Sequence, residues 1–172
     1  QEDAARQAET RGFRYDVVPI APIYDATVKQ LESIFAGREA DVTEENIQAR
    51  CRGMILMAIS NKTGRMLLTT GNKSEMAVGY ATLYGDMAGG FAPIKDCSKT
   101  LVYRLARYRN TQGDAIPERA ITREPSAELR PGQKDSDSLP DYEVLDPILE
   151  AFIEKDMSVE EIAGLGYDRA TV

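Results

Sequence analysis

Two short runs of β-branched and apolar residues constrain the fold most, because expected helices surround both of them. "FRYDVVPI" at residues 13–20 and "RMLLTT" at residues 65–70 are typical of strands. Strands that alternate with helices favour a parallel sheet and therefore an α/β fold. Two parallel strands do not make a stable sheet by themselves. We therefore expect residues 1–172 to be a partial domain that lacks its first strands.

Apolar residues at helical spacing predict the helices. They are expected over residues 1–12, 22–37, 44–64, 98–110, 145–156 and 158–166. Gly12, Gly37 and Gly64 follow the first three of these segments, which is typical of helix C-termini. Asp41 or Thr43 can cap the third helix.

An apolar stripe runs along the third expected helix. It consists of Cys51, Met54, Ile55, Met57 and Ala58. The stripe is broader than contact with one sheet face requires, so it predicts a homodimer or a higher homo-oligomer, with Cys51 in the core. Cys51 and Cys97 form no CxxC pair, and so few thiols predict a reducing cytoplasm rather than a disulfide scaffold.

Composition excludes several function classes. The 172 residues contain no histidine, which removes Ser-His-Asp and Cys-His catalysis and most catalytic zinc sites. The net charge of −7 argues against a nucleic-acid partner, because phosphate contacts need clustered Lys and Arg. No apolar run approaches the length of a membrane span, so no membrane partner is expected. Carboxylates, lysines, hydroxyls and a hard cation such as Mg²⁺ must carry any chemistry.

A glycine-rich, charged loop follows the second expected strand. Ligands of open parallel sheets bind beyond the carboxyl ends of the strands, which is where Thr70 to Glu75 are expected. Glycines let the backbone approach a ligand, and a helix that begins near Ser74 would direct its amides at an anion. Glu75 could hold a cation against phosphate oxygens, with Lys73, Lys95 and Lys99 nearby. Alternatively, Ser74 and Glu75 only cap a helix, and the lysines are solvated.

The polar segment 122–142 contains three prolines and almost no residues to bury. A loop of this length inside a compact domain is usually a lid or a disordered linker. We expect residues 122–142 to be a mobile lid.

Three motifs together resemble the NAD synthetase family, in its glutamine-dependent, two-domain form. They are "TTGNKSE", "YGDMAGG" and "PSAELRPGQKDSDSLPDY", and the resemblance extends over nearly the whole chain. It implies a doubly wound parallel sheet of the adenine nucleotide α-hydrolase, or ATP pyrophosphatase, type. It also implies ATP-dependent amidation of deamido-NAD to NAD through an adenylated intermediate, with release of AMP and pyrophosphate. Ammonia would come from glutamine through a glutaminase domain of the full-length protein, and Mg²⁺ would be the cofactor.

The resemblance also implies the site residues. Glu75 matches the magnesium ligand beside the dinucleotide, and Lys99 matches a phosphate-binding lysine; both are catalytic candidates. The remaining matches are Thr70 and Ser126 for ATP, and Asn46, Arg50 and Asp86 for deamido-NAD.

Each match has a structural alternative. Asn46 and Arg50 could form an ordinary polar face of a helix, and Lys99 could be a surface lysine. Asp86 could only shape a turn, which is a common role of aspartate.

The sequence also departs from the family pattern. It contains no SGGxDS-type phosphate loop, whose acid is the expected second magnesium ligand. This chain alone is therefore expected to be inactive. Two alternative functions stay open: a non-catalytic dimerisation or binding remnant, and another ATP pyrophosphatase such as a GMP or asparagine synthetase.

Overall fold

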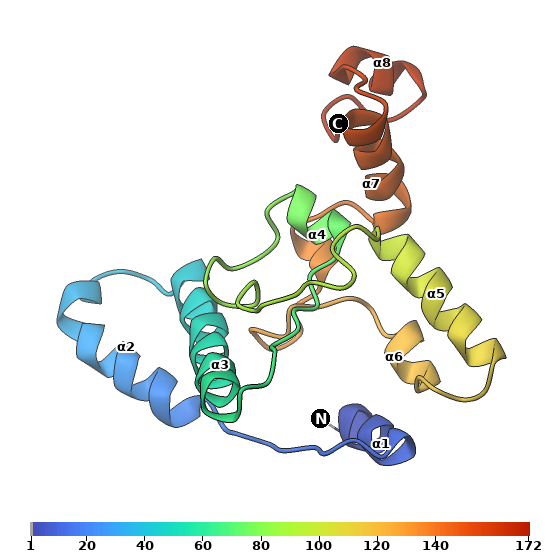
Figure 1. Cartoon of the computed structure of the whole chain (residues 1–172). Coiled ribbons are helices and arrows are strands. Elements are labelled where there is room, and N and C mark those ends of the chain that lie inside the picture. The colour runs from blue at the N-terminus through green and yellow to red at the C-terminus, as the bar shows by residue number, and fades with distance from the viewer. Residues whose placement is uncertain (1) are drawn as a thin grey trace.

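The computed structural model describes residues 2–172, and the described chain is built from helices and loops (Figure 1). The helices are α1 (Glu2–Arg11), α2 (Ala21–Phe35), α3 (Val42–Thr63), α4 (Lys73–Ala77), α5 (Lys99–Thr111), α6 (Glu118–Thr122), α7 (Tyr142–Leu149) and α8 (Val159–Gly164). A 3₁₀ turn spans Asp135–Asp137, and a π-helical turn over Glu150–Glu154 extends α7. The six helices expected from the sequence are all present, whereas α6 and the 3₁₀ turn were not expected.

Local sequence signals explain the ends of the longest helix. Asp41 is the N-cap of α3 and forms a capping box with Glu44, in which each side chain accepts a hydrogen bond from the other residue's backbone N–H. Gly64 ends α3 in the left-handed conformation, with φ of 66°. Cys51 is buried on α3, as its place on the apolar stripe predicted.

The two predicted strands are wrong as strands within residues 2–172. A strand needs a neighbouring strand that accepts and donates its backbone hydrogen bonds, and residues 13–20 are not part of a strand in the described chain. Residues 65–70 make one isolated parallel bridge, from Leu68 to Phe91. Gly89 permits this approach, because a Cβ there would lie 2.5 Å from Cγ2 of Thr69. The doubly wound sheet is therefore not formed by the described residues.

The elements gather around α4 at the centre of the molecule (Figure 1). Helix α2 packs on α3 at one side, while α5 contacts α4, α6 and α7 at the other. Helix α7, the π-helical turn and α8 form a projecting lobe, with a small core of Ile148, Ala151 and Ile162.

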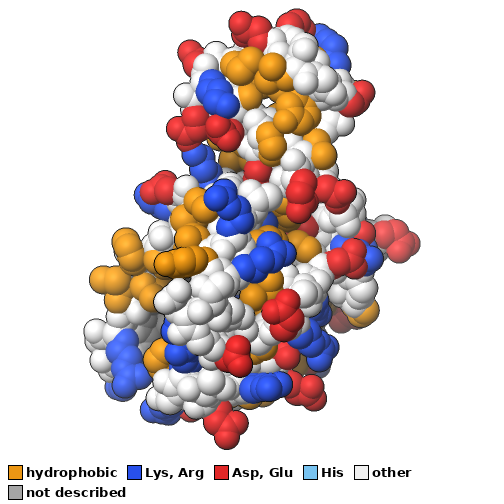
Figure 2. Space-filling view, turned by 90° about the vertical axis from the view of Figure 1, so that its right-hand side faces the viewer, with side chains coloured by type: hydrophobic (Ala, Val, Ile, Leu, Met, Phe, Trp, Pro, Cys, Tyr) orange, Lys and Arg blue, Asp and Glu red, His pale blue; other side chains and the backbone are white. Residues whose placement is uncertain are grey.

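Apolar side chains remain exposed on the outside of this lobe (Figure 2). Phe152, Ile153 and Leu165 are among them. Acidic and basic side chains alternate over the rest of the face in Figure 2. Within residues 2–172, every helix is too short or too polar to span a lipid bilayer.

Candidate active site

One cavity of about 290 Å³ lies between α3 and the loops on both sides of α4, and residues 126–135 close it. It contains six of the seven residues proposed from the sequence, namely Asn46, Thr70, Glu75, Asp86, Lys99 and Ser126. These residues come from segments that are far apart in the chain, so the structure alone brings them together. Their roles toward a ligand stay predictions.

Arg50 is the seventh residue, and it does not line this cavity. Its Nε donates to the carbonyl oxygen of Leu83 at 3.3 Å, which ties α3 to the loop that follows α4. Successive residues of an α-helix point about 100° apart, so a helix that turns Ala49 into the cavity turns Arg50 aside. Arg52 lines the cavity instead. Arg52 was not expected from the sequence, and only the helical face defined by Asn46 and Ala49 could have indicated it.

Glu75 and Lys99 form an ion pair in the wall of the cavity, with 2.8 Å between Oε1 and Nζ. Both side chains are less than a fifth exposed. Glu75 also caps α4: its backbone N–H donates to Asn72, and its Oε2 accepts from the backbone N–H of Asn72 at 3.3 Å. The helix-capping alternative for Glu75 is therefore realised, and the same carboxylate faces the cavity.

Lys99 lies between two carboxylates, because Oδ2 of Asp135 is 4.0 Å from its Nζ. Asp135 is 4% exposed, and its Oδ2 accepts a hydrogen bond of 2.7 Å from the hydroxyl of Tyr142. Its Oδ1 has no hydrogen-bond partner within the described chain. A buried acceptor without a partner is rare in proteins, so this oxygen is a candidate contact for a donor on a ligand.

Asp135 and Tyr142 were not expected from the sequence. Both lie in the polar segment 122–142, where nothing distinguishes Asp135 from the exposed Asp137. Burial raises the pKa of Tyr142 above its usual value, and the hydrogen bond to Asp135 adds to the shift. Burial, followed by the charge of Asp135, raises the pKa of Tyr80 to about 12. Both phenols are therefore protonated donors at neutral pH.

The loop that carries Asp86 is fastened to α3. The side chain of Asp86 accepts a hydrogen bond from the backbone N–H of Thr82 at 2.7 Å, which is the turn-shaping role. The hydroxyl of Thr82 donates to Oδ1 of Asn46 at 2.8 Å. Gly85 packs directly on α3, because a Cβ there would lie 2.9 Å from Cβ of Ala49. Asn46 and Asp86 therefore have structural roles and also line the cavity.

The segment 122–142 is held on α3 by polar contacts. Gln48 donates to the carbonyl oxygen of Leu129 at 2.9 Å, and Gln133 donates to Glu45 at 3.2 Å. Ser126 faces the cavity, and its hydroxyl accepts from the backbone N–H of Glu128 at 3.0 Å. The segment thus closes one side of the cavity without burying an extended apolar surface.

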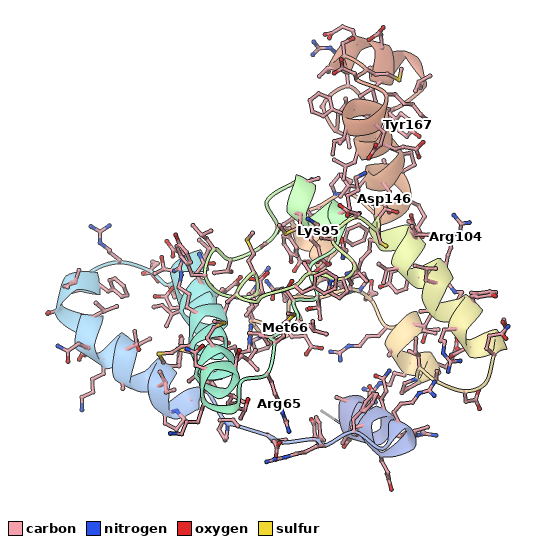
Figure 3. The ribbon with its side chains drawn as sticks, in the orientation of Figure 1. Arg65, Met66, Lys95, Arg104, Asp146 and Tyr167 are labelled. Carbon is pink, nitrogen blue, oxygen red and sulfur yellow. The ribbon has the colours of Figure 1, made fainter. Side chains whose placement is uncertain are left out.

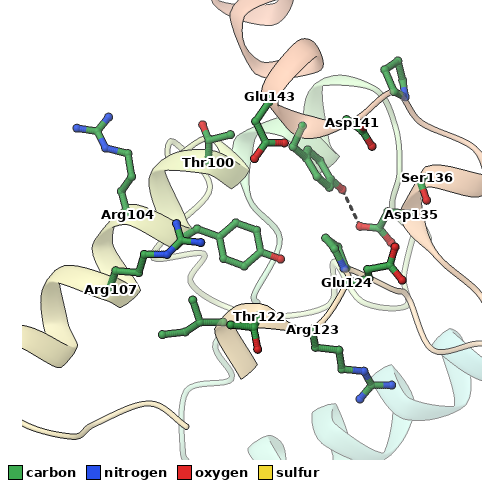
Figure 4. Close-up of a pocket in the computed structure, with 15 residues that line it drawn as sticks. Thr100, Arg104, Arg107, Thr122, Arg123, Glu124, Asp135, Ser136, Asp141 and Glu143 are labelled. Atoms are coloured by element: carbon green, nitrogen blue, oxygen red, sulfur yellow. Dashed lines mark hydrogen bonds between the residues drawn. The ribbon is translucent and has the colours of Figure 1, made fainter. Parts of the chain in front are cut away.

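A second cavity of about 430 Å³ lies between α5, α6 and the start of α7 (Figure 4). Two of the three arginines that line it have neighbours: Arg123 pairs with Glu128 at 2.8 Å, and Arg107 lies over the ring of Tyr103 at 5.8 Å. Asp135 lines both cavities, so its carboxylate is part of the wall between them (Figure 4).

Comparison with known proteins identifies the family. A family model described as NAD synthase matches residues 1–172. The glutamine-dependent NAD(+) synthetase of Acinetobacter baylyi is 55% identical over 99% of this chain and 32% of its own length. The corresponding enzyme of Thermotoga maritima is 56% identical over 99% of this chain and 30% of its own length. The chain thus spans about a third of the length of these relatives.

Solved structures agree with this match. A glutamine-dependent NAD+ synthetase from Acinetobacter baumannii, in complex with ADP, is 47% identical with a TM-score of 0.70, over 99% of this chain and 30% of that one. An NMN synthetase from Francisella tularensis is 28% identical with a TM-score of 0.77, over 94% of this chain and 64% of that one. The fold is therefore that of synthetases of the adenine nucleotide α-hydrolase type. More narrowly, the chain belongs to the NAD synthase family.

The hydrogen bond between Tyr142 and Asp135 gives a stability prediction. Tyr142→Phe removes the hydrogen bond of 2.7 Å to the buried carboxylate of Asp135, so the free energy of unfolding should fall by about 1–3 kcal/mol. The raised pKa keeps the phenol protonated, so this loss should be constant near neutral pH and shrink only as the pH rises past the usual value of 10.0. Chemical denaturation at several pH values measures it. Tyr84→Phe, at a side chain that is 76% exposed, is the control, and equal stability of both variants would contradict the prediction.

Proposed function

We propose that this chain is the substrate-binding part of an enzyme that amidates deamido-NAD to NAD at the expense of ATP. The supporting observation is the convergence of Asn46, Thr70, Glu75, Asp86, Lys99 and Ser126 on one cavity, in a chain of the NAD synthase family. In the first step, a carboxylate oxygen of the nicotinate group attacks the α-phosphorus of ATP, and the bond to pyrophosphate breaks. In the second, the nitrogen of ammonia attacks the activated carbonyl carbon, and the bond to AMP breaks while ammonia loses a proton.

The residues of the cavity suit this chemistry because it needs neutralised charge and fixed orientation rather than an imidazole base. Lys99, held between two carboxylates, can place its ammonium against phosphate oxygens. Thr70 and Ser126 offer hydroxyls to ATP, while Asn46 and Asp86 offer polar groups to deamido-NAD. Arg50 belongs to this proposal through the loop that it holds.

Glu75 is the proposed magnesium ligand. Sites that bind Mg²⁺ with phosphates use one or two carboxylates, and the rest of the coordination comes from water and substrate. No group of three or more candidate ligands exists among residues 2–172, and Glu75 would contribute one carboxylate to such a site. When bound, the cation would neutralise charge that develops on the transferring phosphate.

The full-length protein is also proposed to have a complete parallel sheet, an interface between subunits and a glutaminase domain. Leu68 and Phe91 form a parallel bridge and are each more than half exposed, which supports their joining a doubly wound parallel sheet. Met54, Met57 and Ile59 are exposed along α3 and support a homodimer or higher homo-oligomer there. A glutaminase domain would supply the ammonia, and the enzyme would work in the cytoplasm.

The test is an assay of the full-length polypeptide that contains these residues. With deamido-NAD, ATP, Mg²⁺ and glutamine, we expect NAD, AMP and pyrophosphate in equal amounts, and residues 1–172 alone should give none. Nicotinate mononucleotide, xanthosine monophosphate and aspartate are the competing acceptors. Preferred amidation of one of them, or ADP in place of AMP, would refute the proposed function.

Glu75→Gln in the full-length enzyme tests the metal site. The shape and the hydrogen bond to Asn72 are kept while one charge is lost, so we expect the rate of adenylate formation to fall by about 100-fold or more. Glu154→Gln is the matched control, because Glu154 forms an ion pair with Lys73 of α4 outside the cavity. Equal rates for the two variants at limiting Mg²⁺ would leave Glu75 only its capping role.

Residues 122–142 are proposed to be a lid that is mobile in the free enzyme and ordered over bound nucleotide. The segment buries little apolar surface, so ligand contacts must offset the entropy lost on ordering. A closed lid would also keep water from an adenylate that hydrolyses easily. In limited proteolysis of the full-length enzyme, cleavage within 122–142 should be slowed by a non-hydrolysable ATP analogue with deamido-NAD. Cleavage at one rate in both states would make the segment a passive linker.

A further inference from the structure

A buried carboxylate outside the cavity joins three helices. Asp146 lies on α7 at the base of the projecting lobe, where α4 and α5 meet (Figure 3), and it is 8% exposed. Its Oδ1 accepts a hydrogen bond from the hydroxyl of Ser74 on α4. Its Oδ2 accepts from the backbone N–H of Thr100 at 2.8 Å and from the hydroxyl of Thr100 at 2.6 Å, at the start of α5.

These contacts satisfy the first backbone amides of α5. The N–H of Lys99 donates to the hydroxyl oxygen of Ser74 at 2.9 Å, and that of Thr100 donates to Asp146. The N–H of Leu101 donates to Ser98, the N-cap, at 3.2 Å. Only this last bond is an ordinary local cap. The other two come from α4 and α7, and a negative charge at this end of a helix is electrostatically favoured.

The two residues next to these contacts form the ion pair in the cavity wall. Glu75 follows Ser74 on α4, and Lys99 precedes Thr100 on α5. A shift of either helix would therefore change the distance of 2.8 Å between Glu75 and Lys99. Asp146 itself does not line the cavity, so it can act on a ligand there only through these neighbours.

Helix α7 supplies a second support to the same lysine. Tyr142 lies one helical turn before Asp146, so both side chains project from one face of α7. The hydroxyl of Tyr142 donates to Asp135, and its ring lies 5.2 Å from Nζ of Lys99. Through Asp146, one face of α7 thus fixes the backbone of Lys99. Through Tyr142, the same face fixes the surroundings of the Lys99 ammonium group.

We propose that Asp146 is a positioning residue of the reaction: through Ser74 and Thr100 it sets the position of Lys99 against Glu75 and against the phosphates of ATP. This inference rests on the proposed function. A misplacement of about 1 Å at a reacting group can cost about 100-fold in rate. Loss of Asp146 should therefore lower kcat more than it raises KM.

The experiment is a double-mutant cycle in the full-length enzyme, with adenylate formation as the readout. Asp146→Asn should lower kcat by about 10-fold to 100-fold and change KM for ATP by less than about threefold. In a Lys99→Ala background the same substitution should cost about twofold or less, because the group that Asp146 positions is gone. Ile148→Ala is the matched control: it lies on α7 in the core of the lobe, and it should lower stability but not kcat.

If the Asp146→Asn variant does not fold, Ser74→Ala can replace it in the double-mutant cycle. It removes the hydroxyl between Asp146 and the amide of Lys99 and leaves the contacts of Asp146 with Thr100 in place. Its smaller loss of kcat should also disappear in the Lys99→Ala background. Equal losses in both backgrounds, or a loss no larger than that of Ile148→Ala, would overturn the proposal. An inactive wild-type enzyme would instead refute the proposed function, so the two failures are distinct.

Discussion

The carboxylate of Asp146 is the interaction on which the arrangement of the central helices depends. Helix α4 has only 5 residues, so it cannot hold its position by its own packing. Helix α5 buries none of its residues and needs an external partner at its N-terminus. Asp146 meets both needs with one side chain, because it accepts hydrogen bonds from Ser74 and from Thr100. Glu75 follows Ser74 in the chain and Lys99 precedes Thr100, so these contacts also bring Glu75 and Lys99 together as an ion pair.

A second constraint is the near absence of strand pairing. Residues 65–70 and 13–20 have strand-like sequences, yet a β-sheet requires a neighbouring strand to complete its backbone hydrogen bonds. Within residues 2–172 the single isolated β-bridge joins Leu68 to Phe91, where Gly89 allows the backbones to approach. The sheet proposed for the full-length protein would cover the exposed apolar residues of these segments.

The cavity shows how site residues can serve structure and ligand together. Glu75 caps α4 while it faces Lys99, and Asp86 shapes its turn while it lines the cavity. For Glu75, capping a helix and contacting a ligand therefore do not exclude each other. For Asp86, the same holds for shaping a turn and contacting a ligand. Caps and turns that hold Glu75 and Asp86 in place before a ligand arrives reduce the entropy that these side chains lose on binding.

The sequence by itself determined the helices, because capping, glycine stops and apolar spacing are local. Asp41 and Gly64 could be predicted in this way. The family resemblance also predicted six of the residues that line the cavity. Asp135, Tyr142 and Asp146 could not be predicted, since what distinguishes them is burial and hydrogen bonds to residues distant in the chain. Arg50 does not line the cavity, and its contact with deamido-NAD stays a prediction. Only the tertiary structure decides which of several similar acids is buried beside a lysine. A charged group that is removed from water needs partners, and here these partners come from other helices and loops rather than from neighbours in the chain.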